Sequence, residues 1–389
     1  MTGVTGSRQL QRCEPLEMAA GGLYGLLPTT ALPPSSLTPR QALDNAILPA
    51  LEAGPCFVTF SGGRDSSGIL AAATALARRE GLPLPVPVTR VYPDLPDTDE
   101  SSWQRLVVDH LGLKDWVRLE FRSGESDLLG DAARASLLRH GILYPAALHS
   151  HGAMFERLEP GSLLTGEGGD AVLGNRRGTA LALVRRRRIN AQVARAAADS
   201  LLPRPLQRLR TQALLKSSHQ ARWLRPRALV EHARRAAADI AAEPLLYPAS
   251  TWFITRMRSF ATIQHNHAAI AAEYGLRASD PLLDRGFLAA LAQAGGRLGY
   301  PSRTMAMRAL FSDVLPREAL IRSTKASFNM AHASGVTKEF ARTWDGSGVD
   351  PSLVDAERLR QVWLSHQPPM TRGLPLQSAW AARPAGRIP

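Results

Sequence analysis

The first half of the chain alternates short apolar runs with longer segments of helical periodicity. The apolar runs lie at residues 56–60, 86–92, 116–121 and 162–165. The segments between them carry Ala and Leu at helical spacing. Strands that alternate with helices are typical of a parallel sheet covered by helices on both faces. The pattern therefore predicts an α/β core over residues 38–175.

The rest of the chain divides into three further parts by composition. Residues 1–37 carry scattered Pro, Thr and Ser, which is typical of an irregular lead-in. Residues 176–344 are rich in Ala, Leu and Arg at helical spacing, and strand signals nearly vanish there. Residues 345–389 contain scattered Gly and Pro, so we expect a loose C-terminal tail. The α/β core is thus expected to be followed by a largely helical region.

A first glycine-rich turn, SGGRDSS, follows the apolar run at residues 56–60. Gly62 and Gly63 permit a positive φ and close backbone approach, so successive N–H groups can point at one anion. The turn also carries three hydroxyl groups, those of Ser61, Ser66 and Ser67. Asp65 suits a Mg²⁺ ion between its carboxylate and a phosphate. An ordinary structural turn is the competing interpretation on the residues alone.

A second glycine-rich turn, TGEGGDAVLG, begins at residue 165, after the last of these apolar runs. Its glycines place Glu167 and Asp170 three residues apart. Two acids in one flexible loop suggest one metal ligand and one base. A role for Asp170 as the cap of the following helix is equally open.

Four segments occur in a characteristic order along the chain. They are SGGRDSSG, TGEGGDAVLG, SDPLLDRGFL and a segment that ends in RSTKASF, at residues 61–68, 165–174, 279–288 and 303–328. This set resembles the synthetase domain of the asparagine synthetase family, a branch of the ATP pyrophosphatases with the loop SGGxDS. PDTDES, at residues 96–101, resembles the family's acidic segment after the second strand. The resemblance covers about residues 40–335.

The resemblance implies an ATP-dependent ligase that forms an amide and releases AMP and pyrophosphate. A substrate carboxylate would attack the α-phosphorus of ATP to give an acyl-adenylate, and an amine would then displace AMP. ATP and pyrophosphate would be bound at Ser61, Gly62, Gly63, Asp65, Ser66, Ser67 and Gly166. Asp65 and Asp170 correspond to the family's Mg²⁺ ligands. Glu167 corresponds to the acidic residue beside the adenylate, and Lys325 to the lysine that neutralises developing negative charge.

Two departures from the family pattern bear on the substrates. The glutaminase domain of asparagine synthetases has Cys directly after the initiator Met, whereas residue 2 here is Thr and only a short segment precedes the first turn. We therefore expect no glutaminase activity in this chain. Arg277 and Ser279 stand where the family has Glu and Arg. We therefore expect a pocket that is not shaped for aspartate.

The source of the nitrogen is left open by these segments. TGEGGDAVLG and TDESSWQRLVVDHLG, at residues 98–112, resemble the lasso-peptide macrolactam cyclases and β-lactam synthetases. That likeness favours an amine within the substrate, such as a precursor peptide in natural-product biosynthesis. One alternative is ammonium-dependent asparagine synthesis. Another is a non-catalytic partner protein, derived from a synthetase, that binds a peptide or nucleic acid.

The formal net charge of +13 comes from one segment of the chain. Residues 176–235 hold fifteen Arg and one Lys against Asp199 and Glu231, so the other residues are close to neutral overall. Such a segment suits an acidic peptide, or an accessory partner such as a leader-peptide-binding protein or a protease. Trp223 is its only aromatic residue, which disfavours nucleic acid. A solvated Arg-rich helical face is the competing interpretation.

Cysteine and histidine usage indicates no dedicated metal or disulfide site. The two cysteines, Cys13 and Cys56, form neither a disulfide framework nor a ligand cluster. We expect packing or surface roles for four poorly spaced histidines, His149, His151, His265 and His267. The chain opens with no targeting segment, and no apolar run approaches about 18 residues. We therefore expect a cytoplasmic protein without a membrane span.

Overall fold

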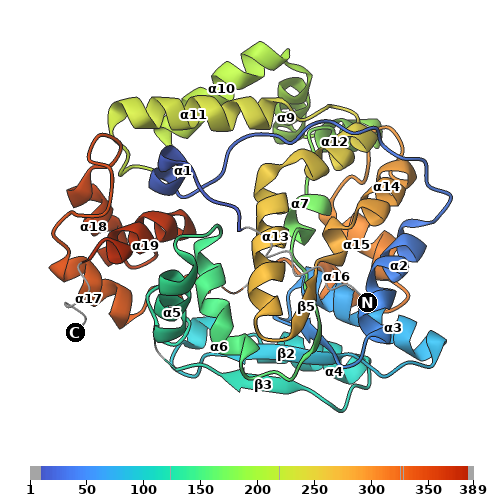
Figure 1. Cartoon of the computed structure of the whole chain (residues 1–389). Coiled ribbons are helices and arrows are strands. Elements are labelled where there is room, and N and C mark those ends of the chain that lie inside the picture. The colour runs from blue at the N-terminus through green and yellow to red at the C-terminus, as the bar shows by residue number, and fades with distance from the viewer. Residues whose placement is uncertain (1–9, 123, 219, 325, 327, 384–389) are drawn as a thin grey trace, which may run out of the picture.

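A parallel sheet of five strands lies at the centre of the fold (Figure 1). The computed structural model describes residues 10–383, apart from residues 123, 219, 325 and 327. The strands are β1 (Cys56–Thr59), β2 (Val86–Val91), β3 (Val117–Glu120), β4 (Gly161–Leu164) and β5 (Leu276–Ser279). Their order is β3-β2-β1-β4-β5, and every neighbouring pair is parallel. The order in which the chain adds strands therefore reverses between β1 and β4, and open sheets bind ligands at such a point.

Helices connect the strands and form the region that follows them (Figure 1). Up to residue 175 they are α1 (Pro15–Ala20), α2 (Pro39–Glu52), α3 (Arg64–Glu80), α4 (Ser101–His110), α5 (Asp131–His140), α6 (Gly152–Phe155) and α7 (Gly169–Val172). The later ones are α8 (Thr179–Arg185), α9 (Ala191–Leu201), α10 (Arg204–Ser217), α11 (Pro226–Ala241), α12 (Tyr247–Phe253), α13 (Arg258–Ala272), α14 (Arg285–Ala294), α15 (Arg303–Phe311), α16 (Arg317–Ile321), α17 (Gly335–Thr343), α18 (Ala356–Leu364) and α19 (Gly373–Ala381). Within the described ranges, no helix is both long and apolar enough to cross a membrane.

Both faces of the sheet are covered by helices, which confirms the predicted α/β fold. Successive side chains of a strand point to opposite faces, and the core divides accordingly. Val58 and Leu164 belong to a cluster with residues of α2, α3, α14 and α15. Phe57 and Leu163, their neighbours in sequence, belong to a second cluster with residues of α6 and α13. The carboxyl ends of β1 and β4 are thus held between two apolar layers.

Strand β5 corrects the prediction that strands nearly end before residue 176. Its sequence, LRAS, contains no β-branched or aromatic residue and is four residues long. The strand forms because β4 offers a pairing edge, with Leu163 opposite Ala278 and Leu164 opposite Ser279. Tertiary pairing therefore creates an element that local composition does not indicate.

The two ends of the chain also differ from their predicted irregularity. The expected tail contains α18 and α19, in which Trp363 and Leu376 are completely buried. The expected lead-in contains α1, where the Ala19 carbonyl accepts a hydrogen bond from the Trp223 indole at 2.7 Å. Figure 1 shows α19 beside α1, and both contribute to one apolar cluster. Burial rather than propensity stabilises such short helices, which is why composition predicted a loose tail.

Candidate active site

The turn of residues 61–67 joins β1 to α3 at the carboxyl edge of the sheet. Gly62 has a φ of +80°, a left-handed conformation that favours glycine, and Gly63 is the N-cap of α3. The hydroxyl oxygens of Ser61 and Ser66 lie 3.2 Å apart, and Ser66 also donates to the Gly63 carbonyl at 3.1 Å. The turn therefore gathers hydroxyl groups at the N-terminus of a 17-residue helix, which suits an anion.

The turn that follows β4 packs directly against this first turn. A Cβ atom added to Gly166 would lie 2.8 Å from the backbone nitrogen of Ser66. One added to Gly169 would lie 2.3 Å from Cγ of Asp65. Both distances are shorter than ordinary van der Waals contact, so glycine at these two positions lets the two strand ends meet.

The SDPLLD segment after β5 shapes the second turn. Thr165 donates its hydroxyl proton to Asp280 at 2.5 Å and accepts the N–H of Glu167 at 3.0 Å. Gly168 has a φ of +80°, and a Cβ there would lie 2.4 Å from the side chain of Leu283. Asp280 is buried, so this hydrogen-bonded chain is shielded from water. The segment thus fixes the backbone that carries Glu167.

Asp65 and Asp170 converge on the guanidinium of Arg303. Nη2 of Arg303 lies 2.7 and 2.5 Å from the two Asp65 carboxylate oxygens, and Nη1 forms an ion pair with Asp170. Burial opposes the charge of Arg303, but the two carboxylates outweigh it and raise its pKa above the ordinary value. Carboxylates that hold one cationic group between two strand ends form a donor set that fits Mg²⁺.

This donor set is small for a metal held by protein alone. Among the described residues, no group of three or more His, Cys, Asp or Glu side chains is arranged to hold a metal ion. Mg²⁺ is commonly bound by one or two carboxylates together with substrate phosphates and water. The pair Asp65 and Asp170 therefore fits Mg²⁺ that arrives with a nucleotide.

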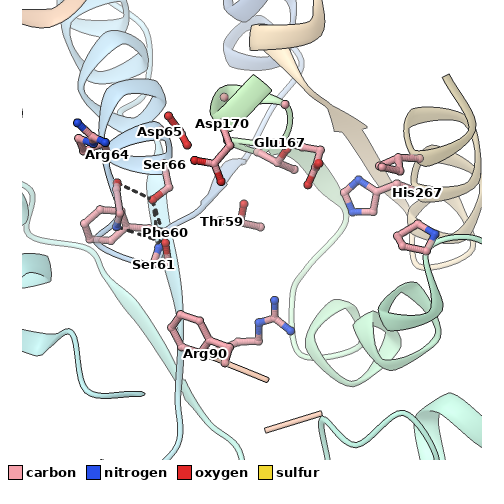
Figure 2. Close-up of a pocket in the computed structure, with 18 of the residues that line it drawn as sticks. Thr59, Phe60, Ser61, Arg64, Asp65, Ser66, Arg90, Glu167, Asp170 and His267 are labelled. Carbon is pink, nitrogen blue, oxygen red and sulfur yellow. Dashed lines mark hydrogen bonds between the residues drawn. The ribbon is translucent and has the colours of Figure 1, made fainter. Parts of the chain in front are cut away.

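A cavity of about 670 Å³ lies over both turns (Figure 2). Predicted site residues that line it are Ser61, Gly63, Asp65, Ser66, Gly166, Glu167 and Asp170. Figure 2 shows Asp65 and Asp170 close together on one wall, while Arg90 extends into the cavity from the opposite wall. The structure therefore brings the two predicted turns into one site. Lys325 lies outside the described residues, so its role stays a prediction.

Two other predicted residues lie away from the cavity surface. Gly62 and Ser67 are not among the described residues that line it. Ser67 is 1% exposed within α3, and its hydroxyl has no hydrogen-bond partner in the described part of the chain. The carbonyl of Gly62 accepts a hydrogen bond from Arg322. Direct contacts of Gly62 and Ser67 with pyrophosphate stay predictions.

Histidines that the sequence assigned to packing or surface also form part of the cavity wall. His151 and His267 line it, with ring centroids 5.5 Å apart, and both contact the ring of Phe155. Packing accounts for the Phe155 contact but not for this exposure to the cavity. Burial lowers the pKa of both imidazoles, although Asp280 opposes the effect at His267. Burial therefore favours the neutral form of both side chains.

Several arginines of the site were also missed by sequence reasoning. Arg90, Arg303 and Arg322 line the cavity, and they come from β2, α15 and the segment after α16. Arg303 and Arg322 lie within the fourth family-like segment, which was the only signal that could have found them. No local pattern distinguishes them from the many other arginines of this chain.

Arg277, one of the two departures from the family pattern, contacts the backbone rather than the cavity. It lies on β5 and donates a hydrogen bond to the Ala53 carbonyl at 2.9 Å. Neither Arg277 nor Ser279 is among the described residues that line the cavity. The expectation that the pocket is not shaped for aspartate stays a prediction.

Comparison with known proteins agrees with this geometry. A sequence model of a family described as asparagine synthase matches residues 39–382, which is more than half of the chain. A search of curated proteins finds no match. The matched residues include the sheet, both glycine-rich turns and most of the helical region. The chain therefore belongs to the asparagine synthase family.

Proposed function

We propose that the chain is an ATP- and Mg²⁺-dependent synthetase that forms an amide bond through an acyl-adenylate. The strongest support is the convergence of Asp65 and Asp170, from two strand ends, on one cationic group inside a single cavity. Membership of the asparagine synthase family supports amide formation driven by ATP.

The first turn provides the groups for the phosphates. Ser61, Gly63 and Ser66 line the cavity at the N-terminus of α3, and we assign them to the pyrophosphate portion of ATP. Asp65 and Asp170 would hold Mg²⁺ where they now hold Arg303. Bound Mg²⁺ would neutralise charge on the phosphates and on the pyrophosphate that leaves.

In the first proposed step, a carboxylate oxygen of the substrate attacks the α-phosphorus of ATP. A new P–O bond forms, the bond to the oxygen that bridges the α- and β-phosphates breaks, and pyrophosphate leaves. The carboxylate is ionised at neutral pH, so this step needs no proton transfer. Donors of the first turn stabilise the charge that develops on pyrophosphate.

In the second proposed step, an amine attacks the acyl carbon. A C–N bond forms, the bond from the acyl carbon to the phosphate oxygen breaks, and AMP leaves. The nitrogen must lose a proton, and Glu167 is our candidate to accept it because it lines the cavity on a fixed turn. By the family resemblance, Lys325 would neutralise charge on the tetrahedral intermediate.

We infer that the amine belongs to the substrate itself, as in the closure of a peptide macrolactam. The support is the likeness of residues 98–112 and 165–174 to the macrolactam cyclases and β-lactam synthetases. Ammonium-dependent asparagine synthesis is the competing reaction. A non-catalytic partner protein is disfavoured because the acidic pair that suits Mg²⁺ lies inside the cavity.

The products formed from ATP test this proposal. Purified protein with ATP, Mg²⁺ and a peptide that carries a free amino terminus and a side-chain carboxylate should yield AMP and pyrophosphate. ³¹P NMR and mass spectrometry would follow the phosphates and the loss of one water from the peptide. Asp65→Asn and Asp170→Asn should each lower the rate at least about 100-fold, as expected for loss of roughly 3 kcal/mol of transition-state stabilisation.

Asp345→Asn is the matched control, because Asp345 is exposed and lies far along the chain from both turns. ADP and phosphate as products would contradict the adenylation mechanism. Turnover of aspartate with ammonium, and not of peptides, would instead establish the competing reaction.

We also propose that the basic segment recruits an acidic peptide or accessory protein. Helix α10 has no buried residue, and Leu206 and Leu209 are 52% and 63% exposed. These two lie three positions apart on one helical face, among arginines. Arg208→Glu should weaken binding of a Glu- and Leu-rich fluorescent peptide at least about tenfold. Arg342→Glu, on α17, is the control, and equal anisotropy titrations would contradict the proposal.

A further inference from the structure

Side chains from other elements hold two carbonyl groups of the SGGRDSS turn. The Ser61 carbonyl accepts a hydrogen bond from Nε2 of Gln104 at 3.3 Å. The Gly62 carbonyl accepts one from Nη1 of Arg322 at 2.6 Å, in a buried setting. Gln104 lies on α4 and Arg322 follows α16, so neither belongs to the turn itself.

These two hydrogen bonds also determine where the next N–H groups point. In a trans peptide the C=O and N–H lie on opposite sides of the chain. Holding the Ser61 and Gly62 carbonyls therefore turns the N–H groups of Gly62 and Gly63 away from Gln104 and Arg322. The N–H of Gly63 donates a hydrogen bond to the Ser61 hydroxyl oxygen at 3.3 Å, and both residues line the cavity. A turn that binds an anion through N–H groups needs this orientation.

Arg322 is itself held from the amino end of α4. Glu100, immediately before this helix, forms an ion pair with Arg322, and both side chains are buried. The Arg322 guanidinium also lies 4.7 Å from the ring centroid of Trp103. Glu100 accepts a further hydrogen bond from the N–H of Ala326 at 2.7 Å. Glu100 thus connects the segment after α16 to the amino end of α4, beside the first turn.

We propose that Gln104 and Arg322 are positioning residues that hold the first turn so that the N–H of Gly63 faces the pyrophosphate site, with Glu100 fixing Arg322. This role rests on the proposed function, since it assigns the first turn to the phosphates of ATP. In this proposal, the PDTDES segment and the segment after α16 both support the conformation of the first turn. The glycines alone allow many conformations, and the hydrogen bonds from Gln104 and Arg322 select the one that suits an anion.

Binding of inorganic pyrophosphate with Mg²⁺ tests the positioning role. Calorimetry should show affinity at least about tenfold weaker for Gln104→Leu and for the double variant Arg322→Met with Glu100→Gln. The double variant avoids leaving a buried carboxylate without its partner. Arg322→Lys, which keeps a donor for the Gly62 carbonyl, should recover part of the loss. Arg177→Met is the matched control, because Arg177 also donates to backbone carbonyls, those of Ser200, Leu202 and Glu243.

Hydrogen exchange without any ligand separates this inference from the proposed function. Amides in residues 61–67 should exchange faster in Gln104→Leu and in the double variant than in wild type. In Arg177→Met their exchange rates should equal those of wild type. Unchanged exchange with weaker binding would mean that Arg322 touches the phosphates directly, and would overturn the positioning role. Faster exchange in these variants, together with a wild-type protein that binds neither pyrophosphate nor ATP, would support the positioning role but overturn the proposed function.

Discussion

Single glycine positions decide how closely the two loops of the site approach each other. Gly169 packs against Asp65, and Gly166 against the backbone of Ser66. A side chain at Gly169 would displace the carboxylate that we assign to Mg²⁺. Close approach, rather than a positive φ, is therefore the reason for glycine at this position.

Gly169→Ala should weaken Mg²⁺-dependent nucleotide binding while the protein stays folded. The added Cβ would lie 2.3 Å from Cγ of Asp65, which forces one turn to move. We expect at least about tenfold lower affinity for an ATP analogue with a methylene between its α- and β-phosphates. Calorimetry would measure it. Gly22→Ala is the control, because a Cβ there meets no atom within 4 Å, and equal affinities of the two variants would contradict the packing.

At the scale of elements, burial determined which segments form helices where the apolar periodicity was weak. Helix α19 has nine residues, and a helix of that length is marginal in water by itself. Gln377 is completely buried in it, and its amide donates to the carbonyls of Leu128 and Ala146 at 3.2 and 2.9 Å. The helix therefore closes the cluster formed by α1 and α17–α19 instead of trailing from it.

Leu376→Ala should lower the free energy of unfolding by about 2–5 kcal/mol, because Leu376 is completely buried in α19. Urea unfolding followed by tryptophan fluorescence would measure the change. Leu364→Ala, on α18, is the matched control, since Leu364 is 39% exposed. If the two substitutions cost the same, residues 373–381 do not pack as described.

At the scale of the whole molecule, buried histidines link stability to pH. His332 is 8% exposed, lines the cavity and hydrogen-bonds through Nδ1 to the Ser126 carbonyl at 2.8 Å. Burial lowers its pKa to about 4, against an ordinary value of 6.5. The unfolded chain therefore binds more protons between these two pH values. The stabilisation from neutral His332 is full above pH 6.5 and is lost as the pH falls toward 4.

His332→Asn should make the free energy of unfolding less dependent on pH. Asparagine can keep a donor for the Ser126 carbonyl but does not titrate. Between pH 7 and pH 5, wild type should lose roughly 2 kcal/mol more than the variant, as linkage predicts from the lowered pKa. Urea unfolding at both pH values measures this difference. Equal losses in the two proteins would show that His332 is not held neutral by burial.

Local sequence determined the strands and turns that carry the chemistry. The alternation of apolar runs with helical segments placed β1–β4, because each strand is a short run bounded by turn residues. Two turns at the ends of β1 and β4 then marked Ser61, Asp65, Glu167 and Asp170, because parallel strands present their carboxyl ends at one edge. Burial of the termini and the existence of β5 could not be predicted from local sequence, because both depend on contacts with residues far away in the sequence.

Only the tertiary structure decided what faces these acids. Arg303 lies 238 positions from Asp65 and 133 from Asp170, yet pairs with both. Arg322 reaches the Gly62 carbonyl across 260 positions, and His267 meets His151 on the far wall of the cavity. Sequence patterns record the spacing of residues along one element, whereas these contacts arise from packing between elements. The acidic and glycine-rich part of the site was therefore predictable, whereas the contributions of Arg90, Arg303 and Arg322 were not.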